Sequence, residues 1–159
     1  MHDDNVELVT WSNAFSCGVK LIDDQHKALI DLINEMFNHV TGNEEEEHEY
    51  FHEVIYEAVK YIKIHMATEE KILSAVKFSG YTGHMKEHNT FIRTVSKNIK
   101  DHEAGKKVTL SLFTKFLKDW VISHIEIMDK QYFEYLRHIA SRKADGKLGI
   151  NSSDVAIFC

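Results

Sequence analysis

The chain has 159 residues, the size of one domain with a full hydrophobic core. Its 19 basic and 25 acidic residues give a formal charge of −6, and no Lys/Arg cluster is long enough to follow a phosphate backbone. Because the N-terminus is acidic and no apolar run approaches the length of a membrane span, we expect a cytoplasmic protein with no nucleic-acid or membrane partner.

Four segments carry apolar residues at three- and four-residue steps, the spacing of amphipathic helices. The predicted helices span roughly residues 20–40, 46–77, 83–103 and 108–143. No proline interrupts them, and the breaks are marked by Gly42, Gly80, Gly83, Gly105 and Gly146. Short connections force sequential helices to lie antiparallel, so the sequence predicts an all-α fold, an up-down-up-down four-helix bundle over residues 20–143.

The two ends of the chain carry weaker patterns. Residues 1–19 are predicted to form an apolar N-terminal arm, and residues 144–159 a C-terminal tail that ends in the apolar sequence DVAIFC. Cys17 and Cys159 lie near opposite ends, which suits neither a disulfide framework nor a thiolate zinc site. We expect both to be free thiols.

The 11 histidines are unusually many for a chain of this length. In the first helix, His26 precedes Leu29 by three residues and Ile33 by seven, so its imidazole should point inward with them. In the second, His65 and Glu69 are four residues apart and share one helix face. A single inward histidine is usually a hydrogen-bonded core residue, and exposed His/Glu pairs at this spacing are common, so neither observation alone indicates a metal.

The third and fourth helices repeat the pattern. His84 and His88 are one turn apart and can chelate one ion. His124 and Asp129 are five residues apart, a spacing at which side chains diverge by roughly 140° on a regular α-helix. For both to bind one centre, the helix must widen locally into a π-helix, or the carboxylate must reach under strain.

Taken together, these side chains would make a costly core for a metal-free bundle. Five imidazoles and two carboxylates facing inward need partners, which metal ions would supply. Imidazole and carboxylate ligands without thiolate suit iron, and zinc or manganese also accept them. The other six histidines are predicted to lie on the surface, because they are found among charged residues or near an end or a loop: His2, His39, His48, His52, His102 and His138.

The segments WSNAFSCGVKLIDDQHKALI, HMATEE, HMKEH and HIEIMDK resemble the hemerythrin family, particularly its bacterial members, over roughly residues 9–140. The resemblance implies a centre of two non-haem iron ions joined by an oxygen bridge. It implies that Glu69 and Asp129 bridge both irons. One iron would be completed by His84, His88 and His124. The other would be held by His26 and His65, which leaves it an open position for O2.

Helix geometry and the resemblance place five side chains around that open position, namely Met66, Trp120, Val121, Ile125 and Tyr132. Almost all are apolar, which favours binding of O2 over oxidation chemistry. Tyr132 is the exception, because a hydroxyl near O2 would either stabilise it or donate a proton.

The resulting hypothesis is a non-enzymatic protein that binds O2 reversibly for storage, transport or delivery. A ferritin-like oxidase is one alternative, but its Glu-x-x-His pairs belong on two helices, whereas Glu45 with His48 and Glu49 with His52 follow each other on one. A second alternative keeps the diiron site for sensing O2, nitric oxide or redox state through an unidentified protein partner. A third is an iron-binding helical protein without gas chemistry.

Overall fold

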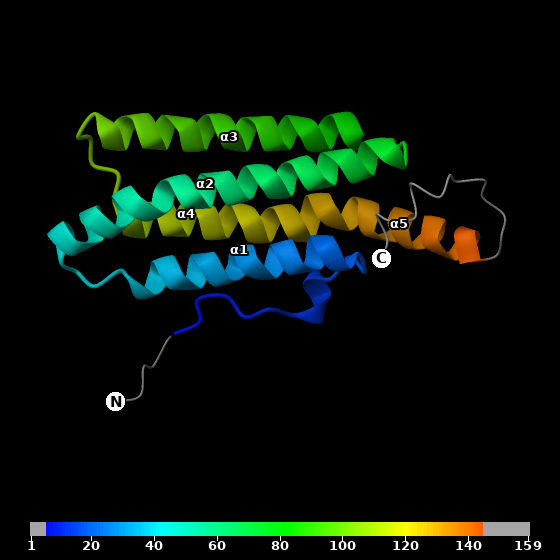
Figure 1. The fold of residues 1–159 in the computed structure, drawn as a ribbon, viewed down its shortest axis with the longest axis horizontal. Helices are drawn as coiled ribbons and strands as arrows, with labels where there is room; N and C mark the ends of the chain where they lie inside the picture. Colours follow the sequence, from blue (N-terminus) through cyan, green and yellow to red (C-terminus); the bar gives the residue numbers. More distant parts are fainter. Residues whose placement is uncertain (1–5, 145–159) are drawn as a thin grey trace.

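The computed structural model describes residues 6–144, with side chains up to residue 142. Four helical columns lie side by side with their axes roughly parallel (Figure 1). The first three are α1 (Lys20–Asn38), α2 (Glu44–Ala75) and α3 (Tyr81–Glu103). The fourth joins α4 (Leu110–Ser123), the π-helix η2 (His124–Asp129) and α5 (Lys130–Ala144) without a break. The predicted all-α four-helix bundle is confirmed.

The helix ends are set by local capping. Asn43 begins α2 by accepting hydrogen bonds from the backbone N–H groups of Glu45 and Glu46. Thr109 caps α4 by accepting from the N–H of Leu112. Gly83 was predicted to lie in a break but is found in the first turn of α3, because the chain turns at residues 78–80 and the helix begins at Tyr81. These caps place the observed ends a few residues from those predicted.

The described part of the N-terminal arm, residues 6–19, lies along α1 (Figure 1). Asn34 holds it by donating to the Val9 carbonyl at 2.8 Å and accepting from the Val9 N–H at 2.9 Å. The arm contains one short 3-10 helix, η1 (Asn13–Phe15), where the sequence predicted no helix. Cys17 is a buried free thiol, as predicted. The predicted tail, including Cys159, lies outside the described residues except for Ala144.

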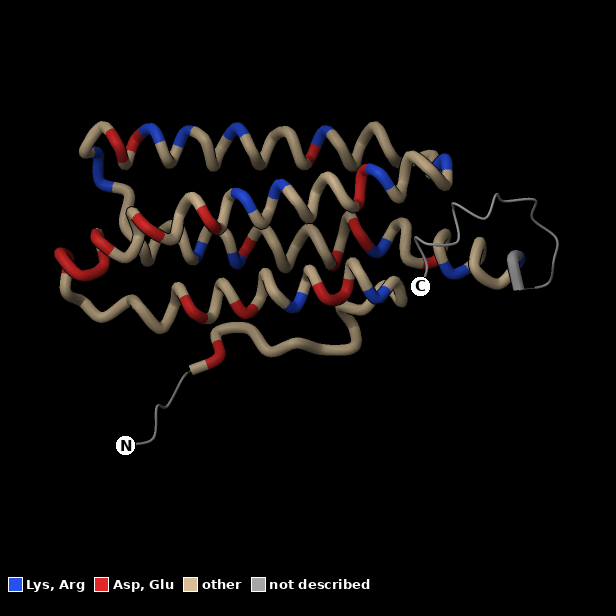
Figure 2. The backbone as a smooth tube through the Cα atoms, viewed as in Figure 1, with Lys and Arg blue, Asp and Glu red and all other residues tan. Residues whose placement is uncertain are grey.

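The core runs the length of the bundle. Helix α1 packs against α2 and α4, and α2 also packs against α3. Phe91 links α3 to α4 by stacking on Trp120 with ring centroids 3.8 Å apart. An acidic run stands where α2 begins (Figure 2). No helix within residues 6–144 is long and apolar enough to cross a membrane. The cytoplasmic location stays a prediction.

Candidate metal centre

Seven buried side chains from all four helical columns meet in the middle of the bundle. All are at most 4% exposed. They form two overlapping groups whose ligand atoms lie within 4.8 Å of one another. One group contains Glu69, His84, His88 and His124; the other contains His26, His65, Glu69 and Asp129. The structure therefore brings together all seven residues that the sequence predicted as ligands.

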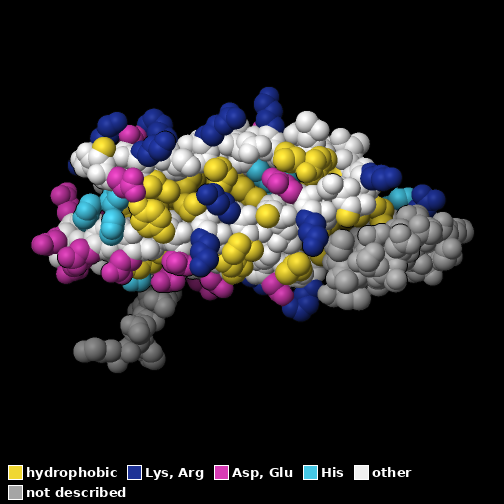
Figure 3. Space-filling view, turned by 45° about the horizontal axis from the view of Figure 1, so that its top comes forward, with side chains coloured by type: hydrophobic (Ala, Val, Ile, Leu, Met, Phe, Trp, Pro, Cys, Tyr) yellow, Lys and Arg dark blue, Asp and Glu magenta, His cyan; other side chains and the backbone are white. Residues whose placement is uncertain are grey.

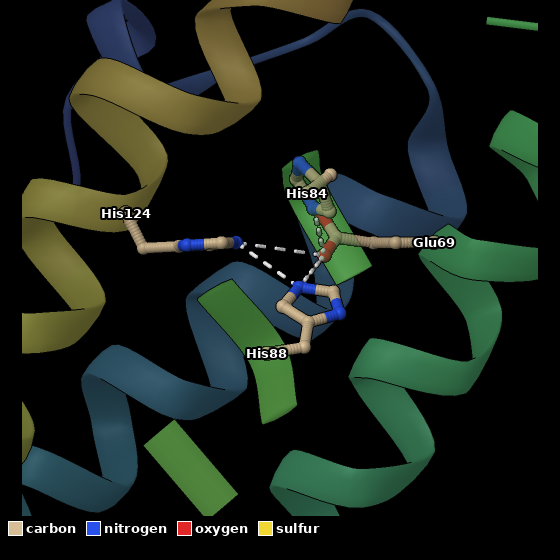
Figure 4. Close-up of side chains that lie close together, drawn as sticks. All are labelled: Glu69, His84, His88 and His124. Carbon is tan, nitrogen blue, oxygen red and sulfur yellow. Dashed lines mark hydrogen bonds and ion pairs between the residues drawn. The ribbon is translucent and has the colours of Figure 1, made fainter. Parts of the chain in front are cut away.

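The first group surrounds one oxygen of Glu69 (Figure 4). Glu69 Oε2 lies 3.1 Å from His88 Nε2 and 3.3 Å from His84 Nε2. His124 Nε2 lies 3.1 Å from His88 Nε2. These imidazoles come from α3 and from the start of η2, so three helical columns contribute to this group.

The second group lies beside it, between α1 and α2. His26 Nε2 is 3.2 Å from Asp129 Oδ2, and His65 Nε2 is 3.5 Å from Glu69 Oε2. The rings of His26 and His65 meet edge to face, with centroids 4.8 Å apart. This group contains two imidazoles, one fewer than the first.

Both carboxylates lie between the groups. Asp129 Oδ1 faces His124 Nε2 at 3.1 Å while its other oxygen faces His26. Glu69 Oε1 lies 3.8 Å from His26 Nε2, and its other oxygen faces the first group. Each carboxylate is thus placed to contact two ions at once.

The π-helix η2 is what brings His124 and Asp129 to one side. It starts at His124 and ends at Asp129. A π-helix has more residues per turn than an α-helix, so residues five apart come to share a face. Of the two possibilities that the five-residue spacing left open, local widening is the one observed.

Two outer side chains orient the imidazoles. His65 Nδ1 lies 3.0 Å from Gln25 Oε1, and His88 Nδ1 lies 3.0 Å from Glu70 Oε1. An Nδ1–H that donates to an oxygen leaves the Nε2 lone pair facing the centre, as metal ligation requires. Gln25 and Glu70 were not predicted from the sequence, although each directly adjoins a predicted ligand in the chain.

The electrostatics of the cluster favour a cation. Burial raises the pKa of Glu69, but His65 and the other imidazoles around it outweigh burial and hold this pKa well below its usual range. Burial lowers the pKa of His26, and the carboxylates of Asp129 and Glu69 reverse this and raise it to about 9. Burial alone dominates at His65 and lowers its pKa to about 4. Ionised carboxylates therefore face imidazoles in a fully buried region.

Several polar atoms of the cluster fit metal ions better than they fit each other. Both ring nitrogens of His26, His84 Nδ1 and both oxygens of Asp129 are buried without a hydrogen-bond partner. His88 Nε2 lies 3.1 Å from Glu69 Oε2 and also 3.1 Å from His124 Nε2, so three possible metal-ligand atoms lie close together. Positive ions between them would satisfy these atoms. The donor set therefore fits a pair of metal ions.

The predicted O2-pocket residues are mostly buried. Met66, Val121, Ile125 and Tyr132 are at most 4% exposed. The Tyr132 hydroxyl donates to Glu69 Oε1, so it is bonded to a carboxylate of the cluster. Trp120 is only partly buried and stacks on His124 with ring centroids 4.4 Å apart. It lies beside the three-imidazole group. Their role in binding O2 stays a prediction.

The surface prediction for the remaining histidines is wrong at one position. The exposed ones, as predicted, are His39, His48, His52 and His138, whereas His102 is buried with 6% of its surface exposed. His2 lies outside the described residues. A signal was present in the sequence, because His102 continues the stripe of Phe91, Val95 and Ile99 at helical spacing.

The chain is similar to known proteins in sequence and in fold. The family model described as Hemerythrin HHE cation binding domain matches residues 17–136, a range that includes all seven clustered side chains. Bacteriohemerythrin from Pseudomonas aeruginosa is 32% identical over 139 residues, which cover 87% of this chain and 88% of that protein. Bacteriohemerythrin from Methylococcus capsulatus is 29% identical over 127 residues, covering 79% and 94%. A crystal structure of wild-type hemerythrin superposes with a TM-score of 0.69 at 28% identity, over 80% of this chain and 96% of that one.

Proposed function

Because the chain belongs to the hemerythrin family, we propose that it binds O2 reversibly at two non-haem iron ions held by the central cluster. The observation that carries this proposal is the division of the seven side chains into two groups that share a carboxylate and differ by one imidazole. Imidazole and carboxylate donors without thiolate suit iron. A ferrous pair bound there would supply the electrons that hold O2 and recover them on release.

In this proposal the ligands have unequal tasks. His84, His88 and His124 would fill the available positions around one ion, with Glu69 and Asp129 shared between both. His26 and His65 would leave the second ion with an open side, where O2 enters. Gln25 and Glu70 keep the His65 and His88 rings turned so that Nε2 faces inward.

The surroundings favour binding over catalysis. Met66, Val121 and Ile125 are buried apolar side chains of the central region and keep water out. The Tyr132 hydroxyl is bonded to Glu69, and burial raises its pKa well above the ordinary value, so it holds its proton. A ferritin-like oxidase would use Glu-x-x-His pairs as ligands. The two such pairs, Glu45 with His48 and Glu49 with His52, lie on exposed early turns of α2 and are not part of the cluster. These features support a carrier or store of O2 in preference to an enzyme.

Reversibility is the property to test. The protein is loaded with iron, reduced without oxygen, exposed to air and then flushed with argon, while its visible absorption is followed through several cycles. We expect an absorption band that appears with O2 and disappears without it. Full conversion to the oxidised form in the first cycle would contradict a carrier function. The variant His84→Ala should lower the iron content and the band together.

A further inference from the structure

Three histidines meet at the end of the bundle where α2 begins and α3 ends. His48 and His52 lie on the first turns of α2, and His102 lies in the last turn of α3. The His102 ring centroid is 4.7 Å from that of His48 and 6.1 Å from that of His52. Histidine side chains are visible together on this end of the molecular surface (Figure 3). The proposed O2 function uses none of them.

His102 is held in place by its surroundings. Its ring packs edge to face on Phe51, with centroids 4.7 Å apart. A neutral imidazole offers one unprotonated ring nitrogen to a metal ion. Burial lowers the pKa of His102, and the neighbouring His48 and His52 lower it further, so the ring is neutral at pH 7.

The two exposed histidines have the spacing of a helical chelate. His48 and His52 are four residues apart, and with Glu49 they form the pattern His-Glu-x-x-His, which on a helix places two imidazoles on one face where zinc binds. Both side chains are free to turn toward His102, because they are exposed. Three imidazoles are a ligand set that zinc accepts, with water at the fourth position.

The charge around the cluster attracts cations. Acidic side chains line the same cavities as the rings: Glu44 and Glu47 lie beside His48 and His102, and Glu49 and Glu53 lie beside His48 and His52. Three further glutamates follow nearby in the chain, Glu45 and Glu46 on the first turn of α2 and Glu103 at the end of α3. This acidic run is visible where α2 begins (Figure 2). Two lysines line the adjacent cavity, which His48 and His102 also line, but Lys106 forms an ion pair with Asp101 at 2.8 Å. The local field is therefore negative overall.

We propose that His48, His52 and His102 form a second metal site, which binds one divalent ion of the zinc class through three imidazoles. The site is independent of the central cluster. His48 precedes His65 by 17 residues on the same helix, which corresponds to about 25 Å along its axis. The two sites share no residue.

The test uses the full chain with its central site already saturated with iron. Zinc chloride is titrated by calorimetry, and bound zinc and iron are measured after dialysis. We expect one zinc ion per chain without loss of iron. His48→Ala and His52→Ala should each weaken zinc binding by at least roughly tenfold, because even outer residues that orient a ligand account for roughly 10- to 100-fold. Iron content should not change, and the exposed His138→Ala should bind zinc like the parent.

His102 is buried, so its variant is chosen to preserve the fold. His102→Gln keeps a polar side chain at this position, and its helicity and thermal midpoint are compared with those of the parent. We expect a folded protein with zinc affinity reduced at least roughly tenfold. Zinc affinity equal to the parent in folded His102→Gln would overturn the three-histidine site. The absence of bound zinc in the iron-loaded parent, or zinc affinity equal to the parent in the His48→Ala and His52→Ala variants, would overturn it as well.

Discussion

The hydroxyl of Tyr132 is the clearest outer contact to a shared carboxylate. It donates to Glu69 Oε1, and both side chains are fully buried. Tyr135 on the same helix makes a comparable bond outside the cluster, donating to the Val76 carbonyl at 2.8 Å. Comparing variants of Tyr132 and Tyr135 therefore separates the effect of losing the Glu69 contact from a general loss of stability.

We expect Tyr132→Phe to weaken iron retention roughly tenfold, because Glu69 loses the donor that fixes its orientation. The measurement is the iron remaining after dialysis against a graded series of chelator concentrations. Tyr135→Phe should lower the thermal midpoint without changing iron retention. Equal iron retention in both variants would show that Tyr132 serves packing alone.

Val121 tests which side of the cluster meets O2. It is buried on α4, three residues before His124, so in the proposed arrangement it leans toward the open position. Val121→Phe should keep both irons but bind O2 weakly or not at all, because the larger ring fills the space that O2 needs. Val121→Ala should admit water and speed autoxidation. Iron content, O2 affinity and autoxidation rate are the measurements.

Ile72 provides the matched control on α2, where it is equally buried. Ile72→Phe should cost about 1–3 kcal/mol of stability through overpacking while leaving O2 affinity unchanged. If O2 affinity and autoxidation stay at parent values in both Val121 variants with iron intact, the open position faces elsewhere.

The metal-ligand candidates could be predicted from the sequence where they repeat at the spacing of a buried helix face. His26, Glu69 and the other five clustered side chains follow the buried stripes, so the sequence located them. Gln25 and Glu70 were missed because they lie beside the buried stripe of their helix. Whether each one contacts an imidazole depends on how the neighbouring helix packs, which the sequence does not give. His102 was missed because its charged neighbours in the chain concealed its buried position.

At the level of the helix, η2 is the feature on which the site depends. The five-residue spacing of His124 and Asp129 predicted either a π-helix or a strained carboxylate, and the structure contains the π-helix. The sequence alone does not distinguish the two conformations, since their relative stability depends on how α5 packs after the widened segment. Helix ends were predicted less closely, because Asn43 and Thr109 set them through side-chain caps.

Deleting Ile127 tests the π-helix directly. This side chain is 63% exposed, so its removal costs little packing. We expect the segment to close into a regular α-helix that draws the Asp129 carboxylate about 1.5 Å along the axis toward His124, which weakens iron retention. Helicity by circular dichroism should stay near the parent value. Ile127→Ala, which keeps the length, should retain iron normally, and normal retention in the deletion would show that the widening is dispensable.

At the level of the whole molecule, we expect the metal-free bundle to be less stable than the iron-loaded one, because of the buried polar cluster. Imidazole and carboxylate atoms without hydrogen-bond partners lie in the middle of an otherwise apolar core. Ligands that bind only the folded state stabilise it, by about 2.7 kcal/mol at a free concentration 100 times the dissociation constant. We therefore expect iron removal to lower the thermal midpoint, measured by calorimetry with and without chelator. An unchanged midpoint would indicate that the cluster is satisfied without metal.

The ratio of O2 to iron tests the central claim most directly. The reduced, iron-loaded protein is titrated with O2 in a sealed cell, and iron is measured in the same sample. We predict two irons per chain and one O2 bound per two irons, with the O2 recovered when the sample is flushed with argon. A single iron per chain, or O2 that is consumed and cannot be recovered, would contradict the account.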